Sequence, residues 1–215
     1  MGNEAKVTGL ELLAAAKAAD ELDKGLGVIA KVVGKLKAQP DVAAQKLAQA
    51  LGEVAKTLQV VENSASEYLS LGIDKGALAT KSKLLLEISS GSLATEVKRG
   101  RGHCHVIGNI YWTYLDKWFA RVLKKTNDYD AIRTVFQRLG NADDDLFNDL
   151  EQLAAKLEQE AGEVLDLVVK RQEKKAQARV LSALPTLQPV RKTMSKTMQT
   201  LYGMKTEFID ISGTA

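Results

Sequence analysis

The chain has 215 residues, a formal net charge of +3, 45% hydrophobic residues and 27% charged residues. This composition is typical of a globular protein with a sizeable core, and it excludes an intrinsically disordered chain. Good helix formers dominate, only three prolines are present, and no run of residues alternates apolar and polar side chains as a strand would. The sequence therefore predicts an all-α fold, a bundle of about six or seven helices in a single domain spanning residues 1–215.

Cysteine content and hydropathy set the expected compartment. A single cysteine, Cys104, excludes an internal disulfide bond. No stretch of 18 or so uninterrupted apolar residues predicts a transmembrane helix, and the N-terminus lacks the basic start and apolar block of a signal peptide. Gly2 is expected to be unmodified, because Lys6 stands where an N-myristoylation motif has Ser or Thr. We expect a cytoplasmic protein.

A regular spacing of apolar residues predicts an N-terminal helical hairpin over residues 8–71. Its first helix opens with a capping box at Thr8, and its apolar residues follow at alternating steps of three and four. Pro40 ends this helix and Asp41 caps the next one. The second helix carries a seam of the same period, made of Leu47, Leu51, Val54, Leu58, Val61, Ala65 and Tyr68. Two such seams with a short connection predict an antiparallel pair, and an alternative division separates this hairpin from a main bundle at 92–208.

The stretch 103–125 predicts a central helix rich in aromatic residues. It holds five of the eleven aromatic residues of the chain, namely Tyr111, Trp112, Tyr114, Trp118 and Phe119. Its polar residues fall on one narrow stripe, so we expect about two thirds of its surface to be buried against neighbouring helices. We expect one continuous helix from Ser92 through this stretch, the alternative being a break at Gly100 and Gly102.

The other helices follow from caps and breakers. Short helices are expected over residues 74–89, before the Ser-Ser-Gly-Ser stretch, and over residues 129–139. A long helix then begins near the run of aspartates at 143–145, and it is expected to persist to about Ala183. Pro185 and Pro189 should separate it from the last helix, because proline breaks a helix interior.

Charge is segregated along the second half of the chain. Residues 98–138 carry nine bases and three acids, residues 141–166 one base and nine acids, and residues 167–205 nine bases and one acid. One interpretation is that antiparallel helices neutralise one another through surface ion pairs.

The alternative interpretation is a basic ridge that contacts an anionic surface. Its residues would be Lys170, Arg171, Lys174, Lys175, Arg179, Arg191 and Lys192. An anionic membrane fits this ridge better than nucleic acid does, because basic amphipathic helices bind anionic lipid. No nucleic-acid-binding motif is present, and no aromatic residue is interleaved with these bases.

His103, Cys104 and His105 form the only sequence cluster of side chains that suit a metal or a thiolate nucleophile. Ligands two residues apart on a helix point to different sides, and no second Cys or His pair completes a tetrahedral site. Cys104 is better explained as a small buried hydrophobe. Phosphate-binding and dinucleotide-binding motifs are missing. The sequence therefore predicts no catalytic residue, no cofactor and no metal, and an enzyme or metal protein built on these three residues is the least favoured alternative.

The functional hypotheses follow from these exclusions. The first is a non-enzymatic protein–protein interaction or regulatory module that binds a protein partner or self-associates through helix faces. The second is a membrane-active bundle that binds anionic lipid and inserts its N-terminal hairpin.

Overall fold

The computed structural model describes residues 27, 41–73, 77–124, 126–140 and 145–211. Of these residues 94% are helical and none lies in a strand, which confirms the all-α prediction. The first helix of the predicted hairpin lies outside the described residues. The elements are, in chain order, α2 (Asp41–Ile73), α3 (Ala77–Thr80), α4 (Ser82–Ile88), α5 (Ser92–Ile110), the π-helical η1 (Tyr111–Leu115), α6 (Asp116–Val122), α7 (Asn127–Gly140), α8 (Asp145–Val169) and α9 (Glu173–Ile211).

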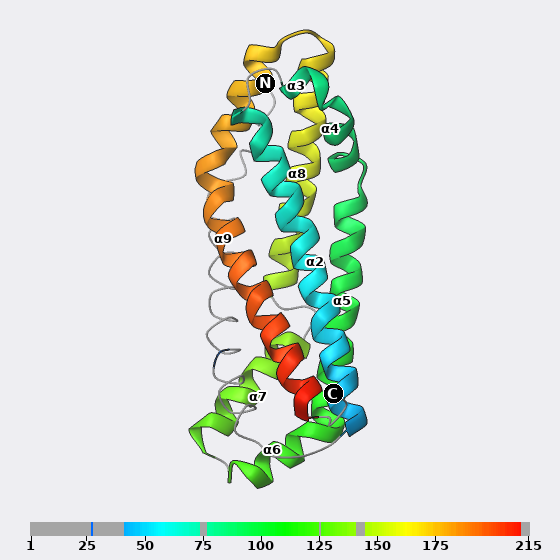
Figure 1. The fold of residues 1–215 in the computed structure, drawn as a ribbon, viewed down its shortest axis with the longest axis vertical. Coiled ribbons are helices and arrows are strands. Elements are labelled where there is room, and N and C mark those ends of the chain that lie inside the picture. Colours follow the sequence, from blue (N-terminus) through cyan, green and yellow to red (C-terminus); the bar gives the residue numbers. More distant parts are fainter. Residues whose placement is uncertain (1–26, 28–40, 74–76, 125, 141–144, 212–215) are drawn as a thin grey trace, which may run out of the picture.

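Four long helices, α2, α5, α8 and α9, run up and down the length of an elongated bundle (Figure 1). The short helices α3 and α4 lie at its upper end in this view, together with the turn between α8 and α9, whereas α6 and α7 lie at its lower end. α2 and α9 are antiparallel: Gly72 at the end of α2 meets Val180 near the start of α9, and Gly52 meets Lys205 near the other end.

The seam predicted for α2 is confirmed. Each of its seven residues is buried, at an exposed fraction of 1% or less. Helices α5 and α9 both pack on α2, so the apolar residues of α2 belong to one continuous core that extends over the long helices.

The aromatic helix is continuous, as expected, because α5, η1 and α6 follow one another without a break from Ser92 to Val122. η1 contains a π-type bond, in which the Asp116 N–H donates to the Tyr111 carbonyl five residues earlier. The wider π turn keeps residues four apart on the same inner side, and Tyr111, Leu115 and Phe119 are all fully buried. Tyr111 stacks on Phe136 of α7, with 4.3 Å between ring centroids.

The expected burial of this helix is wrong. Val106, Trp112, Tyr114 and Val122 are exposed, Tyr114 by 62%. The physical reason is position, because α5 lies at one side of the bundle in Figure 1 and packs on α2, α7 and α8 with a single face. Large apolar side chains on the remaining faces therefore meet no described neighbour that buries them.

The boundary between the last two helices also differs from the prediction. α8 ends at Val169, not near Ala183, and the chain reverses through the next three residues. Gln172 N–H donates to the Leu167 carbonyl at 2.8 Å and Arg171 N–H to the Val168 carbonyl at 2.9 Å, the two bonds of a Schellman motif. Arg171 takes the left-handed position of this motif, with φ 56°. No glycine stands at this turn, so the usual sequence signal for a helix end is absent.

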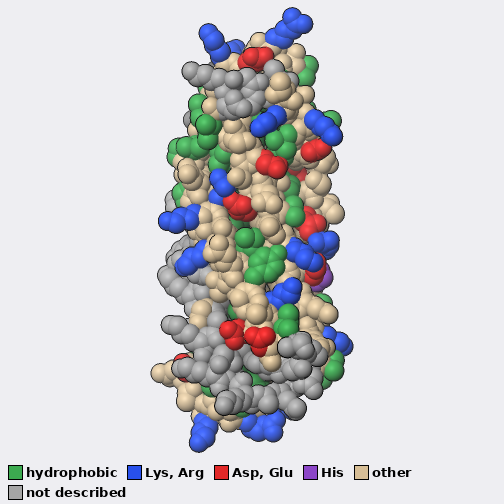
Figure 2. All heavy atoms as spheres, viewed as in Figure 1, with side chains coloured by type: hydrophobic (Ala, Val, Ile, Leu, Met, Phe, Trp, Pro, Cys, Tyr) green, Lys and Arg blue, Asp and Glu red, His purple; other side chains and the backbone are tan. Residues whose placement is uncertain are grey.

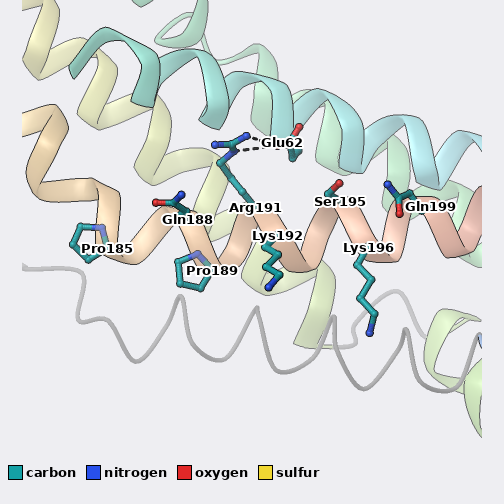
Figure 3. Close-up of a pocket in the computed structure, with 9 residues that line it drawn as sticks. All are labelled: Glu62, Pro185, Gln188, Pro189, Arg191, Lys192, Ser195, Lys196 and Gln199. Atoms are coloured by element: carbon teal, nitrogen blue, oxygen red, sulfur yellow. Dashed lines mark hydrogen bonds and ion pairs between the residues drawn. The ribbon is translucent and has the colours of Figure 1, made fainter. Parts of the chain in front are cut away.

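Pro185 and Pro189 lie inside α9 and do not separate two helices. Both prolines are exposed on the outer face of α9 (Figure 3). Each removes one backbone hydrogen bond, but the four-residue spacing confines the loss to the side that faces away from α2. The apolar stripe on the inner face, which includes Leu187 and Val190, continues without interruption.

Two glycines bring α5 and α7 into backbone contact. A Cβ atom on Gly108 would lie 2.7 Å from the Gly140 Cα, and a Cβ on Gly140 would lie 2.7 Å from the Gly108 Cα. Such a distance is shorter than van der Waals contact, so neither position tolerates a side chain without separating the helices. Gly140 is also the last described residue of α7, and residues 141–144 lie outside the described part of the chain.

We predict that Gly108→Ala destabilises the protein by about 1–3 kcal/mol, because the added methyl group overpacks the contact between α5 and α7. Urea unfolding followed by circular dichroism measures the change. The matched control is Gly102→Ala on the same helix, where a Cβ meets nothing within 4 Å. This control should stabilise the protein by up to about 1 kcal/mol through helix propensity, and equal effects at both positions would contradict the contact.

We predict that Arg171→Gly stabilises the protein by about 1 kcal/mol, because a left-handed conformation is costly for a residue with a side chain and not for glycine. Thermal unfolding gives the measurement. Lys174→Gly, in the first turn of α9, should instead destabilise by up to about 1 kcal/mol. A loss of stability with Arg171→Gly would show that the arginine side chain contributes more than its backbone conformation costs.

Candidate interaction surfaces

The structure divides the seven residues of the predicted basic ridge. Arg179 donates from Nε to Glu160 Oε2 at 2.7 Å and also contacts Glu163, both on α8. Arg191 donates from Nε and Nη2 to Glu62 Oε1 on α2, at 3.0 and 2.8 Å. These two arginines connect α9 to its neighbours, so they belong to the scaffold and not to a free anionic-surface site.

The Glu160–Arg179 pair is the most strongly coupled of these contacts. Burial raises the pKa of the Glu160 carboxyl, but hydrogen bonds from Arg179 and Lys156 outweigh burial and hold this pKa below its usual value. The side chain of Glu160 is only 16% exposed. Tyr68 of α2 is buried beside this pair, and burial raises the pKa of its phenol. The ionised form of Glu160 is therefore favoured because Arg179 and Lys156 compensate for its burial.

Other ion pairs also run between helices along the sides of the bundle. Arg101 of α5 contacts Glu151 of α8 at 3.4 Å and donates to Asn148 at 2.7 Å. Glu158 of α8 accepts the Leu93 and Ala94 N–H groups at 2.9 and 3.1 Å, which caps the start of α5. Four acids of α8 thus contact α5 or α9, as the first interpretation of the charge pattern expected: Glu151, Glu158, Glu160 and Glu163.

Four residues of the predicted ridge gather at the turn between α8 and α9, and we call them the basic apex: Lys170, Arg171, Lys174 and Lys175. All four are exposed. Lys170 pairs with Asp166 one turn earlier, at 2.7 Å, and the other three form no ion pair with a described residue. The upper end of the molecule in Figure 2 accordingly shows protruding Lys and Arg side chains.

Aliphatic side chains are exposed close to the basic apex. Val169, which precedes it directly, is 73% exposed, and Ile73, the last residue of α2, is 72% exposed. Gln177 of α9 donates to the Gly72 carbonyl at 3.1 Å, which places the end of α2 within two turns of the apex. The upper end of the bundle therefore presents cations and apolar groups together.

The lower end carries a second surface, which we call the aromatic face: Tyr114, Trp118 and Val122 with the interleaved bases Lys117, Arg121 and Lys124. The first three are four residues apart, so they share one side of the helix. Tyr114 and Val122 are exposed, and Trp118 is half-buried against Phe119 at 4.8 Å between rings. The three bases are exposed and form no ion pair with another described residue.

A polar network holds the helix beneath the aromatic face. The Tyr129 hydroxyl of α7 donates to Asp116 Oδ1 at 3.0 Å, and Arg133 Nε lies 3.9 Å from the same oxygen. The Arg133 guanidinium also lies 5.3 Å from the centre of the Trp112 ring, a cation–π distance. These contacts fix α6 against α7, so the aromatic face is presented on a rigid support.

The structure separates the residues of the His103–His105 cluster. Cys104 is buried in the core, His105 is exposed and His103 is half-buried. In the part of the chain that the structure describes, no group of three or more His, Cys, Asp or Glu side chains is arranged to hold a metal ion. The aspartates 143 and 144 lie outside the described residues.

A groove of about 870 Å³ follows the outer face of α9 (Figure 3). Lys192, the remaining residue of the predicted ridge, lines it. The described residues around it are Glu62, Pro185, Gln188, Pro189, Arg191, Lys192, Ser195, Lys196 and Gln199. The groove is open, whereas small-molecule sites are enclosed. It therefore does not define a ligand site.

In comparisons with protein-family models, curated protein sequences and solved structures, no match to this chain was found. None of the described helices is long and apolar enough to cross a membrane.

The aromatic face was missed by sequence reasoning, which assigned Tyr114 and Trp118 to the core. The available signal was the set of bases at three- and four-residue steps, because Lys117 and Arg121 share a helix side with Tyr114 and Trp118.

We predict that Glu160→Gln destabilises the protein by about 1–2 kcal/mol at neutral pH, because Arg179 keeps Glu163 but loses the carboxylate that accepts two of its hydrogen bonds. Since the pKa of Glu160 is lowered in the folded state, its stabilising effect is present above the ordinary carboxyl pKa. It should disappear as the pH falls through the lowered value. Urea unfolding of both proteins between neutral pH and strongly acidic pH measures this convergence.

The matched control is Glu87→Gln, because Glu87 pairs with Lys83 at 3.8 Å and is well exposed. It should change stability by less than about 0.5 kcal/mol. A constant difference between wild type and Glu160→Gln down to acidic pH would contradict an ionic role for Glu160.

Proposed function

We propose that this chain is a non-enzymatic interaction module that binds a protein partner through the aromatic face. The observation that carries the proposal is the exposure of Tyr114, by 62%, on the same helix side as Trp118 and between unpaired bases. Tyrosine, tryptophan and arginine dominate the binding energy of protein interfaces. Charged residues of one sign around them favour an acidic partner and accelerate its association.

Rigidity supports the same proposal. The Tyr129–Asp116 hydrogen bond and the Arg133–Trp112 contact hold the helix in place before any partner binds. A preorganised surface loses less conformational entropy on association than a mobile one. The aromatic face also begins at η1, and π-helical turns inside α-helices occur frequently at functional sites.

We predict that Tyr114→Ser combined with Val122→Ser weakens partner binding at least tenfold, because two anchor side chains lose their apolar contact area. Self-association is measured by sedimentation equilibrium over a range of concentrations. For other partners, a photo-crosslinking amino acid replaces Tyr114 in one sample and Leu86 in another, since Leu86 is equally exposed, at 59%, on α4.

The proposal expects one discrete crosslinked species from position 114 that position 86 does not give. Val60→Ser combined with Leu86→Ser is the matched control for the double variant, and it should leave association unchanged. A monomer at all concentrations, together with the same crosslinking pattern from both positions, would rule out the aromatic face as an interface.

A second candidate function is association with an anionic membrane surface. The basic apex favours it, because exposed aliphatic side chains stand beside unpaired bases there.

A further inference from the structure

The basic apex is unusual because its residues are locally unfavourable. Arg171 holds a left-handed backbone conformation, which glycine normally supplies. Lys174 and Lys175 lie in the first turn of α9, where the positive end of the helix dipole disfavours cations. None of these three bases pairs with a described acid. Such departures from local rules concentrate at functional sites, because folding alone would not select them.

Exposed apolar side chains accompany these bases. Val169 and Ile73 are the two most exposed of the large hydrophobic residues that the structure describes, at 73% and 72%. Along the sides of the bundle, Arg179 and Arg191 are engaged between helices. The upper end therefore combines three cations that pair with no described acid and the two most exposed aliphatic side chains.

We propose that the basic apex docks end-on onto an anionic phospholipid surface. Arg171, Lys174 and Lys175 would lie at the level of the headgroup phosphates, and Val169 would enter the boundary between headgroups and acyl chains. Each cation near an anionic leaflet adds to binding, and aliphatic side chains add the apolar part of interfacial association. The contact is peripheral and leaves the helical core closed.

A membrane fits these residues better than the other anionic partners. The four bases protrude from a convex turn, so they cannot enclose a single soluble phosphate. Nucleic acid would be expected to meet aromatic side chains for stacking, and the exposed apolar residues beside the apex, Val169 and Ile73, are aliphatic. A membrane is a flat surface that offers many weakly bound phosphates. Several exposed cations around one apolar residue can contact such a surface at the same time.

The test is co-sedimentation with phosphatidylcholine vesicles that contain or lack phosphatidylserine, at physiological ionic strength. The apex variant combines Arg171→Glu, Lys174→Glu and Lys175→Glu. Its matched control combines Lys46→Glu, Lys98→Glu and Lys192→Glu, which gives the same net charge but alters exposed lysines on the sides of the bundle. Circular dichroism and thermal unfolding verify that both variants are folded.

The proposal expects wild type to bind only phosphatidylserine vesicles, the apex variant to bind about 100-fold more weakly, and the control to stay within a few-fold of wild type. Val169→Ser should lower binding about fivefold without any change in charge. The proposal is overturned if wild type stays in the supernatant, if vesicles without phosphatidylserine bind equally, or if both triple variants lose binding equally. Crosslinking from position 114 is independent of these outcomes, so the protein-partner proposal can survive the failure of this one.

Discussion

The antiparallel contact between α2 and α9 is the constraint on which the rest of the structure depends. The seam of α2 is fully buried, and α9 covers it from Gly72 at one end to Gly52 at the other. Arg191 and Glu62 form their bonded pair within this contact. Because α9 must remain straight enough to follow α2, its two prolines are tolerated only on the outer face. The turn at Arg171 must also place α9 in the register that this contact requires.

How much the sequence could predict depends on whether the information is local. The seam of α2 and the break before α5 follow from apolar period, glycine and caps, and the structure confirms them. The position of the turn after Val169 could not be predicted, because its usual glycine is replaced by Arg171. The continuation of α9 through Pro185 could not be predicted either, because packing against α2 overrides the local helix-breaking tendency.

The candidate sites show the same limit. A run of bases predicts a positive surface, and four of the seven named residues do form one. Arg179 and Arg191 do not, because their partners Glu160 and Glu62 are brought opposite them only by the register of neighbouring helices. Sequence alone also assigned Tyr114 to the core, since hydrophobic residues are assumed to be inside, although much of a folded protein's surface is apolar. Which faces of a helix meet a neighbour is a tertiary property.

The two surfaces differ in chemistry, and this difference is the reason for proposing different partners for them. Rigid aromatic rings on a helix braced by α7 suit the shaped pocket of a protein, whereas aliphatic side chains among flexible lysines suit a fluid lipid interface. The surfaces lie at opposite ends of the bundle in Figure 1, and α9, at 39 residues, is about 58 Å long at 1.5 Å per residue. A molecule docked by the apex would therefore hold its aromatic face several nanometres from the membrane, clear of the headgroups and open to a protein. If both proposals hold, the bundle would act as a spacer between two binding ends.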